Sequence, residues 1–171
     1  VHHMQNRIGI KPGQMVTGNM GSASRMNYTM MGDTVNLAAR LEASAKQYGI
    51  YIQIADTTYQ PVKDQIVIRD LDFVRVMGKT EPAQVYELIS ETSQEPELYK
   101  KILPAFHEAL ALYRNQEWNN AIEAFKASDE LEDMFPGRKT NPSRIYIPRC
   151  EHYRDNSPGD DWDGAWTLTS K

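Results

Sequence analysis

The chain has 171 residues, enough for one ordinary domain or two small ones. Hydrophobic residues make up 40% of it and charged residues 25%, a composition typical of a folded globular protein rather than a disordered one. The net charge of −4 argues against a general nucleic-acid binder, which needs a concentrated basic surface. Residues 1–90 carry nine Lys/Arg against eight Asp/Glu, and residues 91–171 carry ten against fifteen. The first half is therefore the better place for an anionic ligand.

The cysteine content and the N-terminal residues lead to expectations about the compartment and membrane attachment of the protein. A single cysteine, Cys150, excludes an internal disulfide and is consistent with a reducing compartment, so we expect a cytoplasmic location. No apolar run approaches the roughly 18 residues of a membrane span, and no signal peptide is visible. Because the chain begins with Val1 rather than Met, we interpret it as a piece of a longer protein, which other segments could attach to a membrane.

The first predicted elements are short strands. Residues 7–10 and 14–19 have strand character, and Lys11-Pro12-Gly13 between them predicts a tight hairpin. Residues 28–30 predict another short strand. The five methionines between residues 15 and 31 are expected to fill a core.

The strongest helical pattern covers residues 33–47, where apolar residues recur at helical spacing. Asp33 or Thr34 is the expected N-cap and Gly49 the expected stop. A strand at residues 51–54 and a short helix at residues 56–62 follow.

Two further strands, at residues 66–76 and 83–89, surround a Gly-Lys-Thr-Glu turn at 78–81. A strand-rich order with one strong helix predicts an α+β sandwich. Residues 91–97 are polar, contain a proline and predict a linker.

The remaining sequence is helical. Residues 98–116 and 118–132 predict an antiparallel hairpin whose apolar positions resemble those of one tetratricopeptide repeat. One such hairpin cannot bury both faces alone, so it should dock on something. Asn141-Pro142-Ser143 predicts the start of a third helix that ends near Arg154, and residues 157–171 predict no regular element.

Asn36 and Arg40 are the leading candidates for chemistry. They are four residues apart on the predicted helix, so both side chains share one face. An amide beside a guanidinium can hold a ribose and a polyphosphate together. The structural alternative is an ordinary solvated helix face.

Several segments, in order, resemble class III adenylate and guanylate cyclases. These are residues 7–13, the glycine-rich residues 18–29, the helix with Gly32-Asp33-Thr34-Val35-Asn36-Leu37-Ala38-Ala39-Arg40-Leu41-Glu42, and the closing hairpin at 76–79 and 85–88. The resemblance covers about half of the chain. It implies a partial ferredoxin-like sandwich over residues 1–90, joined by the linker at 91–97 to a helical region at 98–171. It further implies conversion of ATP to 3′,5′-cyclic AMP and pyrophosphate in intracellular signalling.

The resemblance also implies residue roles. Asn36 would orient the ribose, Arg40 would bind phosphate oxygens in the transition state, and Lys79 would contact the terminal phosphates. Thr29 occupies the position that helps to select the base. A small hydroxyl there resembles a bacterial subset that uses ATP.

Members of this family use two metal ions, Mg or Mn, held by two Asp residues on strands that would lie upstream of Val1. Asp33 follows Gly32 in the motif and is better explained as a helix cap, so no metal ligand is expected in this chain. Without a complete metal site the chain alone should be inactive. Such sites form across a homodimer, so Asn36 and Arg40 would serve a site whose metals come from the partner chain. The exposed sheet edge and apolar face of the chain should favour self-association.

Other readings stay open. The chain could be a guanylate cyclase, or a catalytically degenerate module that binds a nucleotide or a protein. The helical region could recruit a protein partner or form an independent domain. Neither His2 and His3 nor Cys150 with His152 has the spacing of a metal site, and Cys150 is expected to be a small buried hydrophobe.

Overall fold

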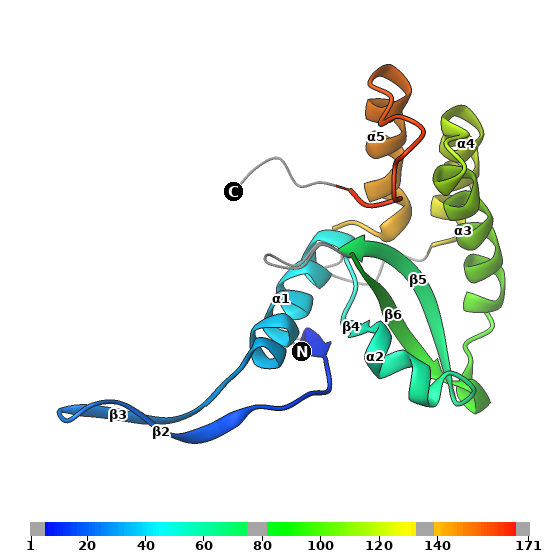
Figure 1. Ribbon diagram of the computed structural model, residues 1–171. Helices are drawn as coiled ribbons and strands as arrows, with labels where there is room; N and C mark the ends of the chain where they lie inside the picture. The colour runs from blue at the N-terminus through cyan, green and yellow to red at the C-terminus, as the bar shows by residue number, and fades with distance from the viewer. Residues whose placement is uncertain (1–5, 75–81, 133–138, 167–171) are drawn as a thin grey trace.

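The computed structural model describes residues 6–74, 82–132 and 139–166. In these residues the fold is α+β, as predicted: a four-stranded sheet, a two-stranded arm and a helical region. Figure 1 shows the arm on one side of the sheet and the helices α3, α4 and α5 on the other. No helix in the described part of the chain is long and apolar enough to cross a membrane.

The main sheet has the strand order β1-β4-β6-β5. Its strands are β1 (Ile8–Ile10), β4 (Ile52–Ala55), β5 (Ile66–Val74) and β6 (Ala83–Glu91). β1 and β4 are parallel, whereas β6 is antiparallel to both of its neighbours. The short α2 (Asp56–Tyr59) and η1 (Gln60–Val62) connect β4 to β5, close to the predicted short helix.

The predicted hairpin between residues 7–10 and 14–19 is wrong. β1 pairs with β4, whereas β2 (Val16–Ser22) pairs with β3 (Arg25–Met31), from Val16 opposite Met31 to Ser22 opposite Arg25. Lys11-Pro12-Gly13 therefore leads from one sheet into another. Local turn chemistry predicted the change of direction but not the partner of each strand.

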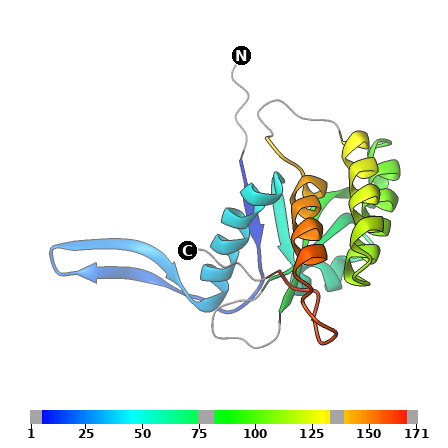
Figure 2. The same ribbon diagram turned by 90° about the horizontal axis from the view of Figure 1, so that it is seen from above.

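The pair β2–β3 forms an arm that extends away from the sheet (Figures 1 and 2). Every residue of β3 is exposed. Met15, Met26, Met30 and Met31 are each more than half exposed, so the prediction that they fill a core is wrong. A two-stranded ribbon has no second layer against which its side chains can pack.

Helix α1 (Asp33–Tyr48) crosses from the arm to β4 and packs on the sheet. The core under it is a cluster of seven buried residues: Leu41, Ala45, Tyr48, Ile50, Ala55, Leu71 and Val85. Gly9 allows the helix to approach β1 closely, because a Cβ at this position would lie 2.1 Å from the carbonyl oxygen of Ala38.

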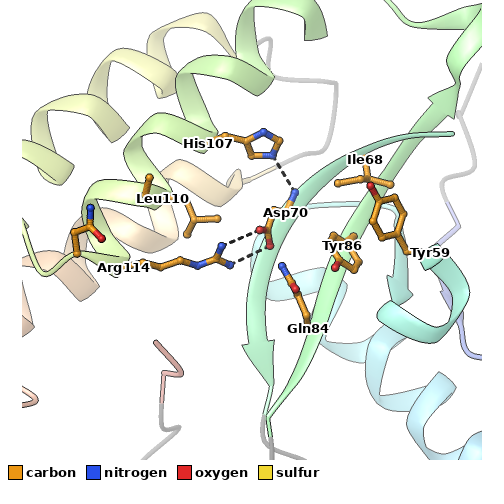
Figure 3. A pocket seen from close by; sticks show the side chains of 10 residues that line it. Tyr59, Ile68, Asp70, Gln84, Tyr86, His107, Leu110 and Arg114 are labelled. Atoms are coloured by element: carbon orange, nitrogen blue, oxygen red, sulfur yellow. Dashed lines mark hydrogen bonds and ion pairs between the residues drawn. The ribbon is translucent and has the colours of Figure 1, made fainter. Parts of the chain in front are cut away.

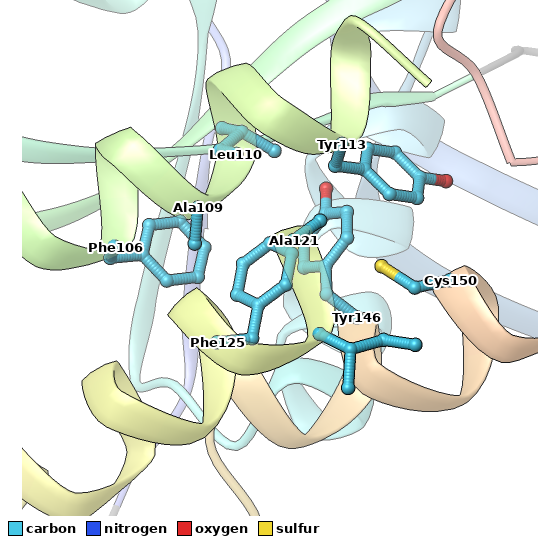
Figure 4. Packing of buried hydrophobic residues seen from close by; sticks show 9 residues of the cluster. Phe106, Ala109, Leu110, Tyr113, Ala121, Phe125, Tyr146 and Cys150 are labelled. Carbon is cyan, nitrogen blue, oxygen red and sulfur yellow. The ribbon is translucent and has the colours of Figure 1, made fainter. Parts of the chain in front are cut away.

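The helical region begins after η2 (Thr92–Gln94) and contains α3 (Tyr99–Arg114), α4 (Trp118–Leu131) and α5 (Pro142–Asp155). Four of the nine buried residues in its core are aromatic, and Figure 4 shows Phe106, Phe125 and Tyr146 side by side within it. Asn141 caps α5 by accepting a hydrogen bond from the Arg144 amide, as the sequence predicted. In the tail, Trp162 packs on Tyr113 with ring centroids 5.2 Å apart.

The hairpin α3–α4 docks on α5 and on the sheet, so the prediction that it must dock is confirmed. Along the outer edge of β5, the Asp70 amide donates to His107 Nε2 and the Tyr146 hydroxyl donates to the Leu71 carbonyl. These contacts satisfy backbone groups that an edge strand otherwise leaves open. The helical region therefore closes the β5 edge of the sheet.

Candidate nucleotide site

Helix α1 carries the candidate site, and its two ends differ. At the start, the N-cap is Gly32 and no side chain caps the helix, so the expectation of an Asp33 or Thr34 cap is wrong. Asp33 is instead the first helical residue, where its carboxylate interacts favourably with the helix dipole. At the other end Gly49 is the predicted stop, with φ of 67° in the left-handed region.

Asn36 and Arg40 are both exposed on α1, whereas Leu41 and Ala45 of the same helix are buried. The pair therefore lies on the solvent side, and its spacing places one side chain a helical turn from the other. Among the described residues neither side chain makes a hydrogen bond or ion pair. Both are available for a ligand.

Thr29 lies on the exposed arm, opposite Gly18 in the β2–β3 register. It precedes α1 by four residues, so it lies on the strand that leads into the helix of Asn36. No hydrogen bond in the described part of the chain joins Thr29 to Asn36 or Arg40. Lys79 lies outside the described residues.

The residues present do not fit a two-metal site. Within the described ranges no three His, Cys, Asp or Glu residues gather as metal ligands. The buried or half-buried carboxylates already have partners: Asp56 accepts from Tyr86, Asp70 from Arg114, and Asp72 from Tyr48 and Arg149. Cys150 is buried, as expected, and burial raises the pKa of its thiol to about 12.

A pocket of about 560 Å³ lies between the sheet and α3 (Figure 3). Arg114 binds Asp70 on its wall through two hydrogen bonds of 2.9 and 3.1 Å. Burial lowers the pKa of His107, which keeps its ring neutral and able to accept from the Asp70 amide. Because these charges neutralise each other, the pocket is less suited to a polyphosphate than the open Asn36–Arg40 face.

Comparison with known proteins decides the family. Residues 1–90, more than half of the chain, match the family model of the adenylate and guanylate cyclase catalytic domain. The chain belongs to the adenylate and guanylate cyclase family.

Two curated adenylate cyclases illustrate the match. The terminal-differentiation-specific adenylate cyclase of Dictyostelium discoideum is 34% identical over 151 residues, 86% of this chain and 7% of that protein. Adenylate cyclase 1 of Rhizobium meliloti is 35% identical over 85 residues, 50% of this chain and 13% of that protein. The Dictyostelium match extends past residue 90 into the helical region. The chain spans less than a fifth of the length of these cyclases.

Solved structures of both cyclase types are also similar in sequence. The adenylyl cyclase CyaB from P. aeruginosa is 35% identical, with 53% of this chain and 43% of that chain covered and a TM-score of 0.42. The guanylyl cyclase Cya2 is 30% identical, with 52% and 43% covered and a TM-score of 0.41.

The sequence analysis missed three buried, hydrogen-bonded residues at the C-terminal end of the helix that carries this site: Tyr48 on α1, Asp72 on β5 and Arg149 on α5. The available signal was an acidic residue flanked by apolar ones in a predicted strand, since Asp72 stands between Leu71 and Phe73. A buried carboxylate requires a partner, but strand patterning does not reveal which one.

Proposed function

We propose that this cyclase chain supplies the ribose- and phosphate-binding residues of an adenylate cyclase site that forms 3′,5′-cyclic AMP and pyrophosphate from ATP. The observation that carries the proposal is the exposed Asn36–Arg40 face of α1, where neither side chain has a partner among the described residues and which lies within the residues that match the family.

In this site Arg40 donates hydrogen bonds to phosphate oxygens as negative charge moves toward the leaving pyrophosphate. A planar guanidinium suits that task because it offers several donors in a fixed geometry. Asn36 orients the ribose so that its 3′-hydroxyl faces the α-phosphate. Lys79 contacts the terminal phosphates as a compact charge. Thr29 contributes to the choice of adenine, and its placement on the strand leading into α1 supports that role.

A homodimer is part of the proposal. The arm exposes Val16, Met26, Tyr28, Met30 and Met31, and an apolar surface of this kind favours cover by another polypeptide. In the full-length protein such a partner would complete the nucleotide site. The ligands of the Mg or Mn pair would come from outside the described residues, because these provide none in either copy. A membrane attachment elsewhere in the full-length protein and a cytoplasmic location of this part stay predictions.

The helical region keeps its tetratricopeptide-like sequence pattern as an interpretation only. The apolar face of the hairpin α3–α4 already packs on α5 and β5, which weakens the case for a separate protein partner there. The division into a cyclase part, a linker and a helical part also stays a prediction.

The test is Arg40→Ala in the full-length protein, with cyclic nucleotide formation measured from ATP and from GTP. Turnover should fall by about 10²–10³-fold, the scale for removing one transition-state donor. Lys46→Ala is the matched control, because Lys46 is an exposed cation in the last turn of the same helix and should leave turnover unchanged. An unchanged rate in Arg40→Ala would refute the role of Arg40, and faster turnover of GTP would favour a guanylate cyclase. A wild-type protein without turnover would favour the degenerate binding module.

A further inference from the structure

The end of α1 is joined to the helical region through one buried carboxylate. Asp72 Oδ2 accepts a hydrogen bond from the Tyr48 hydroxyl at 2.5 Å and another from Arg149 Nη1 at 2.6 Å. Its Oδ1 accepts from the Phe73 amide at 2.8 Å. Tyr48, Asp72 and Arg149 come from α1, β5 and α5, and each is less than 8% exposed.

Backbone packing makes a second, independent contact at the same end of α1. A Cβ at Gly49 would lie 2.0 Å from the carbonyl oxygen of Thr140, the residue that precedes the Asn141 cap of α5. Only glycine permits both this approach and the left-handed φ of 67°. Ile145 of α5 also packs against the buried cluster beneath α1.

The same helix carries Asn36 and Arg40 on its exposed face. An α-helix transmits a displacement of one end to the other, since its backbone hydrogen bonds hold the intervening turns together. Packed, hydrogen-bonded elements of this kind are the physical means by which distant residues affect a site. The contacts at Tyr48 and Gly49 therefore affect the position of the helix face that carries Asn36 and Arg40.

We propose that the helical region positions the nucleotide-binding helix, with Tyr48, Asp72 and Arg149 as positioning residues for Asn36 and Arg40. The expected effect on catalysis rests on the proposed function. The claim that contacts with α5 fix the position of α1 does not. The Dictyostelium match, which continues past residue 90, is consistent with a helical region that belongs with the cyclase part.

The decisive variant is Tyr48→Phe, which removes the hydroxyl link of α1 but leaves Asp72 paired with Arg149. Tyr113→Phe is the matched control, because the Tyr113 hydroxyl is buried in the helical core without a hydrogen-bond partner among the described residues. In the full-length protein, Tyr48→Phe should lower kcat about tenfold and change KM for ATP less than about twofold, since Arg40 acts on transition-state charge. Tyr113→Phe should change neither constant.

A distance measurement tests the positioning without any activity. Spin labels at A43C on α1 and at K63C, which follows η1 and precedes β5, are both at exposed positions. They report on the position of α1 relative to the η1–β5 connection in the 171-residue chain. The native Cys150 is fully buried and its thiol is poorly ionised, so labelling at the two introduced sites is selective. The distance distribution should shift or broaden in Tyr48→Phe and stay unchanged in Tyr113→Phe.

Arg149→Lys provides a second variant should Tyr48→Phe fail to fold. It keeps a charge beside Asp72 but loses the guanidinium geometry, and it should alter the same distance distribution. An unchanged distribution in whichever variant folds overturns the control of α1. A shifted distribution with unchanged kcat overturns the positioning role at the site. A wild-type protein without cyclase turnover refutes the proposed function, yet the distances still decide the role of α5.

Discussion

The β5 edge of the sheet and the β2–β3 arm differ in how their exposed strands are covered. Along β5, helices α3 and α5 supply hydrogen bonds to the strand edge, and buried charges meet in pairs. On the opposite side, the arm exposes methionines, Val16 and Tyr28, and β1 pairs only with β4 among the described residues. The β5 side is closed by the chain itself, whereas the arm side offers an apolar surface for another polypeptide. Substitutions on the first should therefore change folding stability, and substitutions on the second should change association.

The largest stability effect is expected at Arg69, which is fully buried on β5. Its guanidinium forms an ion pair with Glu132. Its Nε lies 3.1 Å from Glu87 Oε2, which is an ion pair whose geometry is not that of a hydrogen bond. Burial alone lowers the pKa of Arg69, but the two carboxylates outweigh it and raise the pKa above its usual value. Arg69→Met would leave both carboxylates without this partner and should cost about 3–5 kcal/mol in urea unfolding.

The control for Arg69 is Arg144→Ala, which breaks the pair of Arg144 with Asp129, where the arginine side chain is 45% exposed. It should cost about 1 kcal/mol or less. Equal losses from the two variants would show that burial of the Arg69 pairs contributes little.

A smaller loss is expected from Tyr146→Phe. The Tyr146 hydroxyl donates to the Leu71 carbonyl on the outer edge of β5, and both groups are buried. Removing the donor should lower the free energy of unfolding by about 1–2 kcal/mol. Tyr113→Phe removes an equally buried hydroxyl that has no hydrogen-bond partner in the described residues, and it should change stability by less than about 0.5 kcal/mol. Similar losses in thermal or urea unfolding would contradict the closure of the β5 edge by Tyr146.

Acid should weaken the same edge through His107. Burial lowers the pKa of His107, and its neutral Nε2 accepts from the Asp70 amide. The unfolded chain therefore takes up this proton at a higher pH than the folded chain does. The contribution is complete above the ordinary His pKa near 6.5 and declines as the pH falls below it. Urea unfolding between pH 8 and pH 5 should show a steeper loss for the wild type than for His107→Gln, and parallel curves would refute this role.

The arm should show almost no stability effect but a clear effect on association. Met30→Lys replaces an exposed apolar side chain, so the free energy of unfolding should change by less than about 0.5 kcal/mol. The wild-type chain should self-associate in sedimentation velocity, and Met30→Lys should shift it toward smaller species. Asn27→Lys adds the same charge to the same exposed strand without removing apolar surface, and should change the distribution less. A monodisperse wild-type monomer would contradict the interpretation of the arm as an interface.

Local sequence signals located most elements but not their partners. The helical spacing from Val35 to Ala45 and the glycine at position 49 predicted α1 and its end, and Asn141 predicted the cap of α5. The pairing of residues 7–10 failed because β1 joins β4, more than forty residues away. Strand pairing over such a separation depends on which faces must be buried together, and a turn signal does not contain that information.

In the candidate site, too, local sequence determined some features and long-range packing determined others. The sequence alone determined the spacing of Asn36 and Arg40 and the resemblance that assigns them to a nucleotide. It also determined that a strand-rich half precedes a helical half. These depend on the helical period and on local residue order, which are properties of short segments.

Only the tertiary structure placed Tyr48 and Arg149 on the carboxylate of Asp72, although Arg149 is 77 residues from its partner. It also separated the exposed methionines of the arm from the core. Burial of a charge or of a methionine depends on what the rest of the chain packs against it, and no local pattern specifies that.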